Sequence, residues 1–298
     1  MLKIIIIPLT LLALFIHQGK PAETETKEKK KKPKLELGWH KQAAAKLKFT
    51  KNSFDNWVVQ GGENSWSWQL DVLANVKHVQ EKYQWEVSGK FSFGRAKVTG
   101  AESQKTEDEI RMESVFTFRT FLFLRGYLSL LIQSQSAPGY NYETDPIIRI
   151  SNFLDPLYIT QSMGFDYEPG KIFKTRAGFA LKETFTRNHP VPYADNPETD
   201  RIERLKVEIG LNSTTDLDIK INEIISFTSR FELFSNFRGF DRIDIYWDNL
   251  FSAGIAKFVE VSFNFKLIYD KDVSPRRQLK QTLAVGLIYS FFKEKKQN

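Results

Sequence analysis

The sequence predicts an all-β protein, an antiparallel transmembrane β-barrel of about twelve strands with up-and-down order. Three observations predict it: period-two alternation of apolar and polar residues, connections that alternate between long and short, and an apolar N-terminal segment typical of export signals. Aromatic residues make up 14% of the 298 residues and include 25 Phe. A lipid-facing barrel uses such rings on its outer surface and at its rims.

The alternation is cleanest in the last third of the chain. In the final segment, 281–292, one face is apolar and the other carries small or polar residues. The apolar face contains Leu283, Val285, Leu287, Tyr289 and Phe291, and the opposite face contains Thr282, Ala284, Gly286 and Ser290. These small side chains predict room inside the barrel beside the seam. Because a soluble barrel or sandwich alternates in the same way, the connections and the export signal must decide between the two.

The alternating segments define twelve predicted strands. Most reach the length of about nine to eleven residues that a tilted strand needs to cross a bilayer. The strands are 42–50, 65–79, 83–95, 108–119, 125–136, 155–167, 171–185, 201–213, 216–233, 241–254, 258–270 and 278–292.

The connections sort by length when the N-terminus is placed in the periplasm. Long outer connections and short inner turns are the outer-membrane pattern. The predicted outer connections are 51–64, 96–107, 137–154, 186–200, 234–240 and 271–277. The predicted inner turns are 80–82, 120–124, 168–170, 214–215 and 255–257.

Polar residues interrupt the predicted lipid face at three positions: Gln161, Glu183 and Glu223. Acidic residues cost less than basic ones there, especially near an interface. A β-bulge near Ile224 and Ile225 would instead shift the phase, and the sequence leaves both explanations open.

Aromatic residues gather at the two predicted rims, where amphipathic rings are favoured. The outer rim is assigned Trp66, Trp68, Phe93 and Tyr269, and the inner rim is assigned Tyr83, Phe118, Tyr127, Tyr167, Phe173, Tyr289 and Phe291.

The N-terminal residues predict export. Met1–Lys3 forms a short positive start, and the apolar run 4–16 is too short to span a bilayer but typical of a signal peptide. An N-terminal membrane anchor is the alternative interpretation. The predicted organisation is a signal peptide at 1–22, a Lys-rich periplasmic linker at 23–38, the barrel at 39–292 and a polar C-terminal tail at 293–298. We therefore expect the protein in the bacterial outer membrane.

Charge and cysteine content exclude several classes. Much of the net charge of +7 lies in Lys27–Lys34, which we interpret as a solvated linker, with contact to an acidic surface as the alternative. No nucleic-acid partner is expected, because no basic helix or nucleic-acid fold signature follows. The absence of Cys excludes disulfides and thiolate metal sites. No phosphate-binding loop, dinucleotide fingerprint or metal-ligand motif is present, so no cofactor or metal is expected.

The predicted lumen face carries charges of both signs. The candidate lining residues are Glu86, Lys90, Arg111, Glu113, Arg176, Arg204, Lys206, Glu208, Lys220, Arg230, Glu260 and Lys266. Opposite charges should pair, because an unpaired charge in a narrow lumen is costly. Two interpretations follow: a salt-bridged plug that keeps the barrel rigid, or a narrow pore whose lining selects solutes by charge.

The first outer loop contains four candidate ligand-binding residues: Trp57, Gly61, Gly62 and Trp66. The glycines permit a tight turn. The Trp rings either anchor the loop in the membrane interface or stack on a sugar or another ligand.

No enzyme is expected. An outer-membrane phospholipase needs His, Ser and Asn together on the lipid-facing outer side to activate the hydroxyl, and His78 is predicted at the inner end of a strand. A rim protease needs acidic residues and a His at the outer rim, and His189, Asp195 and Asp200 share one Pro-rich outer loop without further support.

The segment Asn56–Asn64, in which Asn-Trp is followed closely by Gly-Gly-Glu-Asn, resembles the family known as domain of unknown function 3078. Lys105–Ile110 and Pro138–Tyr142 are similar to that family too, and the resemblance extends over most of residues 38–292. It implies an outer-membrane barrel with no assigned activity and no catalytic residues. The tail after Phe292 departs from barrels that end on an aromatic residue, which the assembly machinery reads.

The sequence thus predicts an integral outer-membrane β-barrel of unassigned activity, either a narrow solute channel or a structural barrel. The alternatives are a rim-active hydrolase (lipase or protease), and an adhesin or subunit of an outer-membrane export assembly. The expected partners are the lipid bilayer, lipopolysaccharide, the outer-membrane assembly machinery and small solutes.

Overall fold

The computed structural model describes residues 37–53, 64–120, 124–142, 144–191, 193–196, 198–239, 243–271, 273–274 and 276–292. In this part of the chain, twelve strands form a closed antiparallel barrel. They are β1 Gly38–Asn52, β2 Ser65–Val79, β3 Tyr83–Val98, β4 Gln104–Arg119, β5 Arg125–Ser134, β8 Leu157–Tyr167, β9 Phe173–Phe185, β10 Leu205–Lys220, β11 Ile225–Asn236, β12 Ile243–Ala256, β13 Val259–Tyr269 and β14 Gln278–Phe292. The predicted fold class is confirmed.

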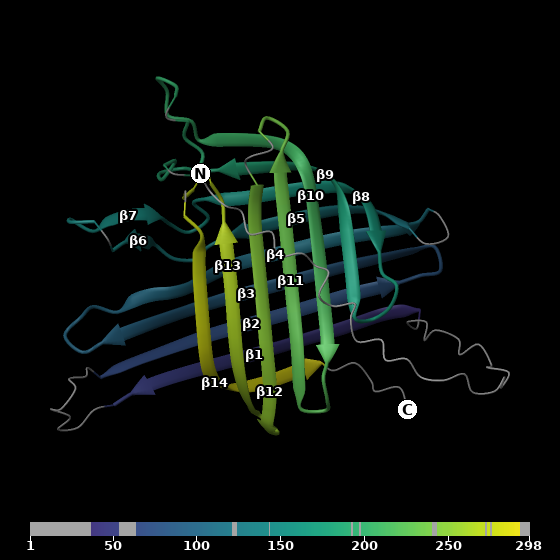
Figure 1. Ribbon diagram of the computed structural model, residues 1–298, viewed down its shortest axis with the longest axis horizontal. Coiled ribbons are helices and arrows are strands. Elements are labelled where there is room, and N and C mark those ends of the chain that lie inside the picture. Colours follow the sequence, from purple (N-terminus) through teal and green to yellow (C-terminus); the bar gives the residue numbers. More distant parts are fainter. Residues whose placement is uncertain are drawn as a thin grey trace, which may run out of the picture. The chain divides into compact units, whose positions relative to one another are not determined.

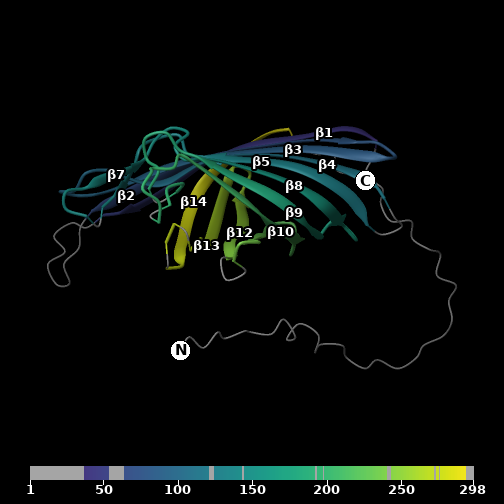
Figure 2. The same cartoon turned by 90° about the horizontal axis from the view of Figure 1, so that it is seen from above.

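Barrel strands that follow one another in sequence pair with one another, and β14 closes on β1. The seam is in register at Leu47 opposite Leu287 and at Phe49 opposite Val285, so the same side chains face outward on both strands. Strands on the two opposite walls cross steeply (Figures 1 and 2), as the tilted strands of a closed barrel must. A two-stranded sheet outside the barrel, β6 Gly139–Asn141 with β7 Ile148–Ser151, lies in the connection between β5 and β8 and was not predicted.

The two ends of the barrel differ in their connections. We call the end with connections 80–82, 120–124, 168–172, 221–224 and 257–258 the turn end, and the end with 53–64, 99–103, 135–156, 186–204, 237–242 and 270–277 the loop end. No turn-end connection exceeds five residues. The predicted sorting by length holds except at 99–103, which is as short as the longest turns. The predicted signal peptide, the tail at 293–298 and all but the last two residues of the predicted linker lie outside the described residues.

One predicted turn is wrong. Thr214 and Thr215 lie inside β10, and the chain reverses at 221–224 instead. The Thr215 hydroxyl shares a hydrogen bond of 2.9 Å with Thr175 on β9, so its polarity is satisfied within the sheet. At the true turn, Asn222 Oδ1 accepts from the backbone N–H groups of Ile224 and Ile225, the local bonding that favours Asn in turns.

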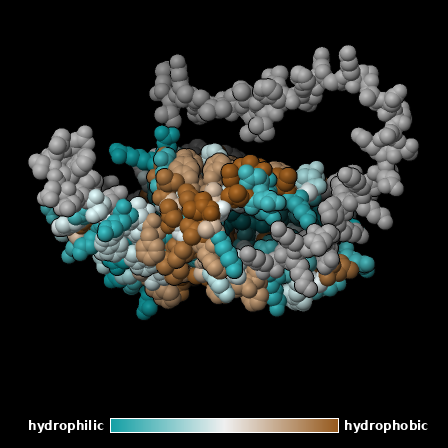
Figure 3. All heavy atoms as spheres, turned by 90° about the horizontal axis from the view of Figure 1, so that it is seen from below, coloured by the Kyte–Doolittle hydropathy of each residue, from teal (hydrophilic) through white to brown (hydrophobic). Residues whose placement is uncertain are grey.

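Alternation places apolar residues outside and polar residues inside. On β14, Leu283 is 67% exposed, whereas Ala284 beside it is 5% exposed and faces the lumen. Figure 3 shows hydrophobic side chains gathered over one face of the barrel. A closed barrel satisfies its backbone hydrogen bonds internally, and an apolar outer surface suits lipid, so the fold is of the outer-membrane type. Among the described residues, no helix is long and apolar enough to span a membrane.

The three polar residues predicted on the lipid face have separate structural explanations. Gln161 on β8 donates from its side-chain amide to the carboxylate of Glu183 on β9 at 2.9 Å, so each polar group satisfies the other. Glu223 lies in the turn 221–224 and has no place on a strand face. A turn, and not a bulge, therefore separates the two alternating runs on either side of Ile224.

Close approach of two backbones requires glycine at one point of the wall. Gly164 on β8 lies opposite Gly178 on β9. A β-carbon on Gly178 would collide with the carbonyl oxygen of Met163, and one on Gly164 would collide with that of Ala177. Side chains at these two positions would force the strands apart, as expected at a tight bend of a barrel.

Most predicted rim aromatics face outward, including Trp66, Tyr83 and Phe291, which are all at least 39% exposed. Two predicted positions are wrong. Tyr127 is 1% exposed and donates its hydroxyl to Asn212 inside the lumen, because β5 presents odd-numbered residues inward. Tyr269, the last residue of β13, lines a cavity at the loop end.

Candidate functional site in the lumen

Ion pairs cross the middle of the lumen and join walls that are far apart in the strand order. Arg230 on β11 donates to Glu113 on β4 at 2.6 Å, and Arg111 on β4 pairs with Glu232 on β11. Arg176 on β9 pairs with Glu113 as well. Since β4 has neither β9 nor β11 as a neighbour in the sheet, these side chains meet across the lumen.

We call this group the central ion cluster; it consists of Arg111, Glu113, Arg176, Asp216, Arg230 and Glu232. Its three arginines and three carboxylates sum to zero formal charge. Arg230 is the hub, since it also reaches Glu232 at 2.6 Å and Asp216 at 3.3 Å. Glu113 and Arg176 are 5% and 4% exposed, so the pairs are shielded from water. Two donors, Arg111 Nη1 and Arg176 Nε, have no hydrogen-bond partner within the described structure.

Further ion pairs surround the central ion cluster. Lys90 on β3 reaches Glu109 on β4 at 2.8 Å and Asp248 on β12 at 3.6 Å, which again joins opposite walls. Lys266 on β13 meets Glu107 at 2.8 Å. The lumen is therefore crossed at several levels, and the expected pairing of opposite charges is observed.

Lysines from β1 occupy the space beside the seam. Lys46 pairs with Glu260 on β13 at 2.8 Å, and Lys48 pairs with Asp71 on β2 at 2.8 Å. The Lys48 stem lies against Gly286, where an added β-carbon would come within 3.1 Å of Lys48 Cγ. The room that the small inner face of β14 predicts is thus filled by the lysine side chains of the neighbouring strand.

Within the described residues, two cavities are considered inside the barrel. The larger, of about 650 Å³, reaches the loop end, where Tyr193 and Val273 of the long connections line it. We call it the loop-end cavity. A second cavity of about 280 Å³ is lined from β1–β4 and β10–β13. Glu113, Arg176 and Glu232 line the first cavity, and Asp216 and Arg230 line the second, so the central ion cluster borders both.

The rim of the loop-end cavity is held by buried carboxylates. Asp108 accepts from the backbone N–H groups of Ser136 and Ala137, at 2.7 and 2.9 Å, and Lys105 donates to the carbonyl oxygen of Ala137 at 2.8 Å. These bonds tie the start of connection 135–156 to β4. Asp155, at the end of that connection, accepts from two backbone N–H groups of 186–204, those of residues 187 and 188, at 2.9 and 2.8 Å. The two longest connections are therefore fixed to each other.

Two loop residues at this end have shifted acidities. Burial raises the pKa of the Tyr193 hydroxyl. The pKa of Glu203 is lowered from 4.5, chiefly because the Thr199 hydroxyl donates to its carboxylate at 2.7 Å.

Ten of the twelve predicted lumen residues lie on inward positions of the barrel strands and take part in ion pairs. These ten are Glu86, Lys90, Arg111, Glu113, Arg176, Lys206, Glu208, Arg230, Glu260 and Lys266. The other two are placed elsewhere: Arg204 precedes β10 and is exposed, and Lys220 is the exposed last residue of that strand.

Several functional candidates were missed from the sequence. Glu232 and Asp216 complete the central ion cluster, and Lys182 bridges Asp244 and Asp270 at 2.6 and 3.6 Å. The signal was available, since each strand residue in this set has the even-numbered phase of inward neighbours such as Arg230 and Lys206. What the sequence lacked was a way to rank inward positions by their partners across the barrel.

The predicted outer-loop ligand residues are described only in part. Trp57, Gly61 and Gly62 lie outside the described residues. Trp66 is the second residue of β2 and is 43% exposed on the outer surface. Its placement there suits an interfacial anchor.

The residues that a rim hydrolase would need are not joined by a hydrogen bond or ion pair in the described structure. Asp195 accepts from the backbone N–H of Glu203 at 3.0 Å and so serves the loop backbone. His78 stacks on Trp39 outside the barrel, with ring centroids 4.4 Å apart. Within the described residues, no group of three or more His, Asp or Glu side chains could hold a metal ion.

Residues 49–140 match the model of a family described as "Protein of unknown function (DUF3078)". The resemblance predicted from the sequence is confirmed over this stretch, which is shorter than the predicted 38–292. It includes Lys105 and Asp108, whose bonds reach Gln135 and Ala137, just before the segment Pro138–Tyr142. No curated protein matches the chain.

Several solved structures are similar at low identity. The translocator domain of the autotransporter NalP from Neisseria meningitidis is 10% identical, with a TM-score of 0.38, over 86% of this chain and 90% of that one. The NanC porin is 7% identical, with a TM-score of 0.39, over 83% and 98%. The COG4313 outer membrane channel from Pseudomonas putida F1 is 8% identical, with a TM-score of 0.39, over 89% and 99%. The barrel assignment rests on strand pairing and not on these likenesses.

Proposed function

We propose that this outer-membrane barrel, whose residues 49–140 match the family of unknown function 3078, is a narrow channel for small solutes. The observation that carries the proposal is the division of the lumen. Two cavities, of about 650 and 280 Å³, are separated by ion-paired side chains: the central ion cluster has members on each, and Glu107 and Lys266 line both. A barrel that served only as a rigid wall would have no need of a cavity large enough for a small molecule.

The central ion cluster would act as the constriction. A solute that moves from one cavity to the other would have to displace ion pairs such as Arg230–Glu113 or Lys266–Glu107, whose atoms lie 2.6 and 2.8 Å apart. Because the cluster has no net charge, discrimination there would depend on solute size and on the ability to replace the displaced hydrogen bonds. The wild-type conductance is accordingly expected to be low.

Planar-bilayer conductance of the purified chain tests this proposal. Arg111→Gln combined with Glu232→Gln removes both ends of one cross-lumen pair and leaves no charge without a partner. We expect this double variant to conduct several-fold more than wild type. Lys206→Gln with Glu208→Gln is the matched control, because that pair, 3.2 Å apart, lies outside the walls of both cavities. Heat-modifiable gel mobility verifies that each variant is folded.

The channel proposal is wrong if folded wild type and the folded Arg111/Glu232 double variant are both silent. The cross-lumen pairs would then support the other interpretation, a structural barrel held rigid by a salt-bridged plug. Contact with lipopolysaccharide and delivery by the outer-membrane assembly machinery belong to either version of the proposal.

A further inference from the structure

The loop-end cavity has the size of a small-molecule site. Its volume of about 650 Å³ falls within the range of about 300–1,000 Å³ that small-molecule pockets occupy. Its walls come from β4, β5, β8–β14 and three loop-end connections. Asp108 and Asp155 hold two of those connections in place by hydrogen bonds, so the rim has a defined shape. A rim of defined shape suits recognition of one class of ligand.

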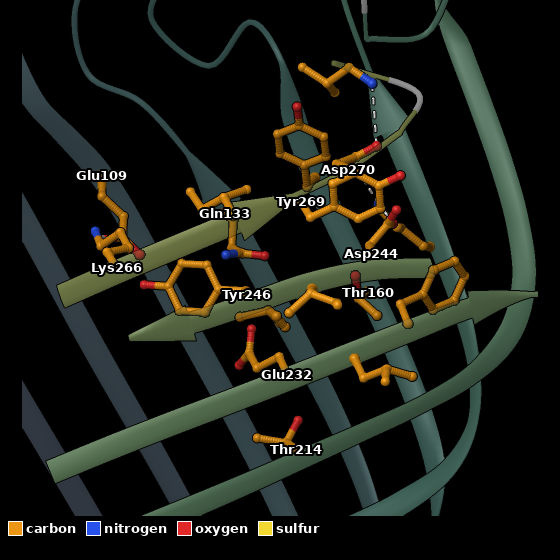
Figure 4. Close-up of a pocket in the computed structure, with 18 of the residues that line it drawn as sticks. Glu109, Gln133, Thr160, Thr214, Glu232, Asp244, Tyr246, Lys266, Tyr269 and Asp270 are labelled. Carbon is orange, nitrogen blue, oxygen red and sulfur yellow. Dashed lines mark hydrogen bonds and ion pairs between the residues drawn. The ribbon is translucent and has the colours of Figure 1, made fainter. Parts of the chain in front are cut away.

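Aromatic rings and neutral polar groups face this cavity together. The rings are those of Tyr158, Tyr193, Phe234, Tyr246 and Tyr269, and the neutral polar groups include Ser129, Gln133, Thr160, Asn212 and Thr214. Figure 4 shows Tyr246 and Tyr269 on one side of the cavity, with Gln133, Thr160 and Thr214 also directed toward it. Rings offer flat apolar faces, while hydroxyls and amides both donate and accept hydrogen bonds.

Every charged side chain of the wall already has an ion-pair partner. Seven acidic and four basic residues line the cavity, and each takes part in an ion pair. Lys182, for example, lies between Asp244 and Asp270. A charged ligand would have to break one of these pairs and leave a buried charge alone, which is costly. The wall therefore favours an uncharged ligand.

One buried donor on the wall remains unused. Arg176 is 4% exposed and lines the cavity, and its Nε has no hydrogen-bond partner in the described structure. A buried donor without a partner costs free energy that a ligand oxygen would recover. Because Nε itself is fully buried, a ligand oxygen would gain this bond only if the Arg176 side chain turned toward the cavity.

We propose that the loop-end cavity binds a neutral oligosaccharide of two or three sugar units, an inference that rests on the channel function proposed above. A sugar ring has an apolar face that stacks on aromatic rings, an edge of hydroxyls that both donate and accept, and no formal charge. Among the rings on this wall, those of Tyr158, Tyr193 and Tyr269 have no stacking or cation–π contact within the described structure. Tyr246 differs, because the cations of Arg111 and Lys266 lie 5.6 and 5.9 Å from its centroid.

Calorimetric titration of the detergent-solubilised chain tests the ligand class. The probes are three neutral trisaccharides, built of glucose, mannose or galactose, together with anionic trigalacturonate and a cationic glucosamine trimer. We expect at least one neutral trisaccharide to bind and both charged trimers to fail. Tyr158→Leu should weaken that binding about tenfold, because it removes a stacking face. Thr160→Val, which removes a polar group, serves where Tyr158→Leu does not fold.

Tyr289→Leu is the matched control, since Tyr289 is 56% exposed on the lipid face and should leave sugar binding unchanged. The inference is overturned if a charged trimer binds better than every neutral one, if none of the five binds, or if neither cavity variant weakens binding. Conductance is recorded separately. Sugar binding supports the site and defeats the channel if wild type and the Arg111/Glu232 double variant are both silent. Conductance without binding supports the channel and defeats the site.

Discussion

The lipid face and the lumen are built from the same twelve strands, yet their side chains are stabilised differently. On the lipid face, Leu283, Val285 and Leu287 need nothing but an apolar surrounding. In the lumen, Glu113 is satisfied by two named partners, Arg176 and Arg230, which come from other strands. The comparison teaches that the outer surface depends on residue class alone, whereas the interior depends on particular pairs.

Removal of one carboxylate from the central ion cluster should have the largest effect. Glu113→Ala leaves Arg176 and Arg230 buried with one partner fewer, and breaking a buried pair costs about 3–5 kcal/mol. The free energy of unfolding, measured by denaturant titration of the reconstituted barrel, should fall by that amount. Glu223→Ala, at an exposed turn residue, is the control and should change it by less than about 0.5 kcal/mol. Equal effects at the two positions would contradict the comparison.

A cation on the lipid face should cost somewhat less. Leu283→Arg places a charge on β14 at a position that is 67% exposed to lipid, and arginine near the bilayer midplane costs about 2–4 kcal/mol. Reconstitution yield and unfolding free energy should both fall, while Leu283→Met should behave as wild type. If the arginine variant is as stable in lipid as wild type, this surface does not face a membrane.

The hydrogen bond between Gln161 and Glu183 is the place where the lipid face behaves like the lumen. Gln161→Leu leaves Glu183 without this donor and should cost about 1 kcal/mol. The double change to leucine at both positions should restore stability, because both polar groups are then gone. A double-mutant cycle of unfolding free energies measures the coupling. Additive single effects would mean that the pair contributes nothing.

The smallest effect is expected at the loop end, where water competes with protein partners. The pKa of Glu203 is lowered by its bond from Thr199, so the ionised carboxylate contributes stability above the ordinary pKa of 4.5. That contribution should disappear as the pH falls through the lowered value. Proteolysis of the 186–204 connection should therefore increase in acid, and Thr199→Val should move the carboxyl titration, followed by NMR, back toward 4.5. An unchanged titration in that variant would show that the hydroxyl is not the cause.

Alternation predicted most strands because the pleat turns a period of two directly into two faces. It misplaced the turn between β10 and β11, because Thr214 and Thr215 look like turn residues in the sequence. In the barrel, Thr215 bonds to Thr175 of the preceding strand, 40 residues earlier. The β6–β7 sheet was missed for a related reason, since its strands are too short to show a period.

The sequence could predict which residues of the candidate site face the lumen, but it could not predict which of them form pairs. Parity placed Arg111, Glu113 and Arg230 inward, but their mutual contacts depend on how the closed barrel brings β4 opposite β11. The same parity points Tyr127 inward, but the sequence assigned it to the rim because it is aromatic. Its hydroxyl meets Asn212 across the lumen, a partner that sequence spacing does not reveal.

The sequence by itself determined that the chain forms a barrel with an apolar exterior and a charged interior, because strand periodicity is a local property of neighbouring residues. Tertiary structure decided which charges meet, where the two cavities lie, and that lysines from β1 fill the space beside Gly286 on β14. These features depend on the closure of the sheet and the relative shift of its strands, which bring together residues more than 100 positions apart, such as Arg111 and Glu232.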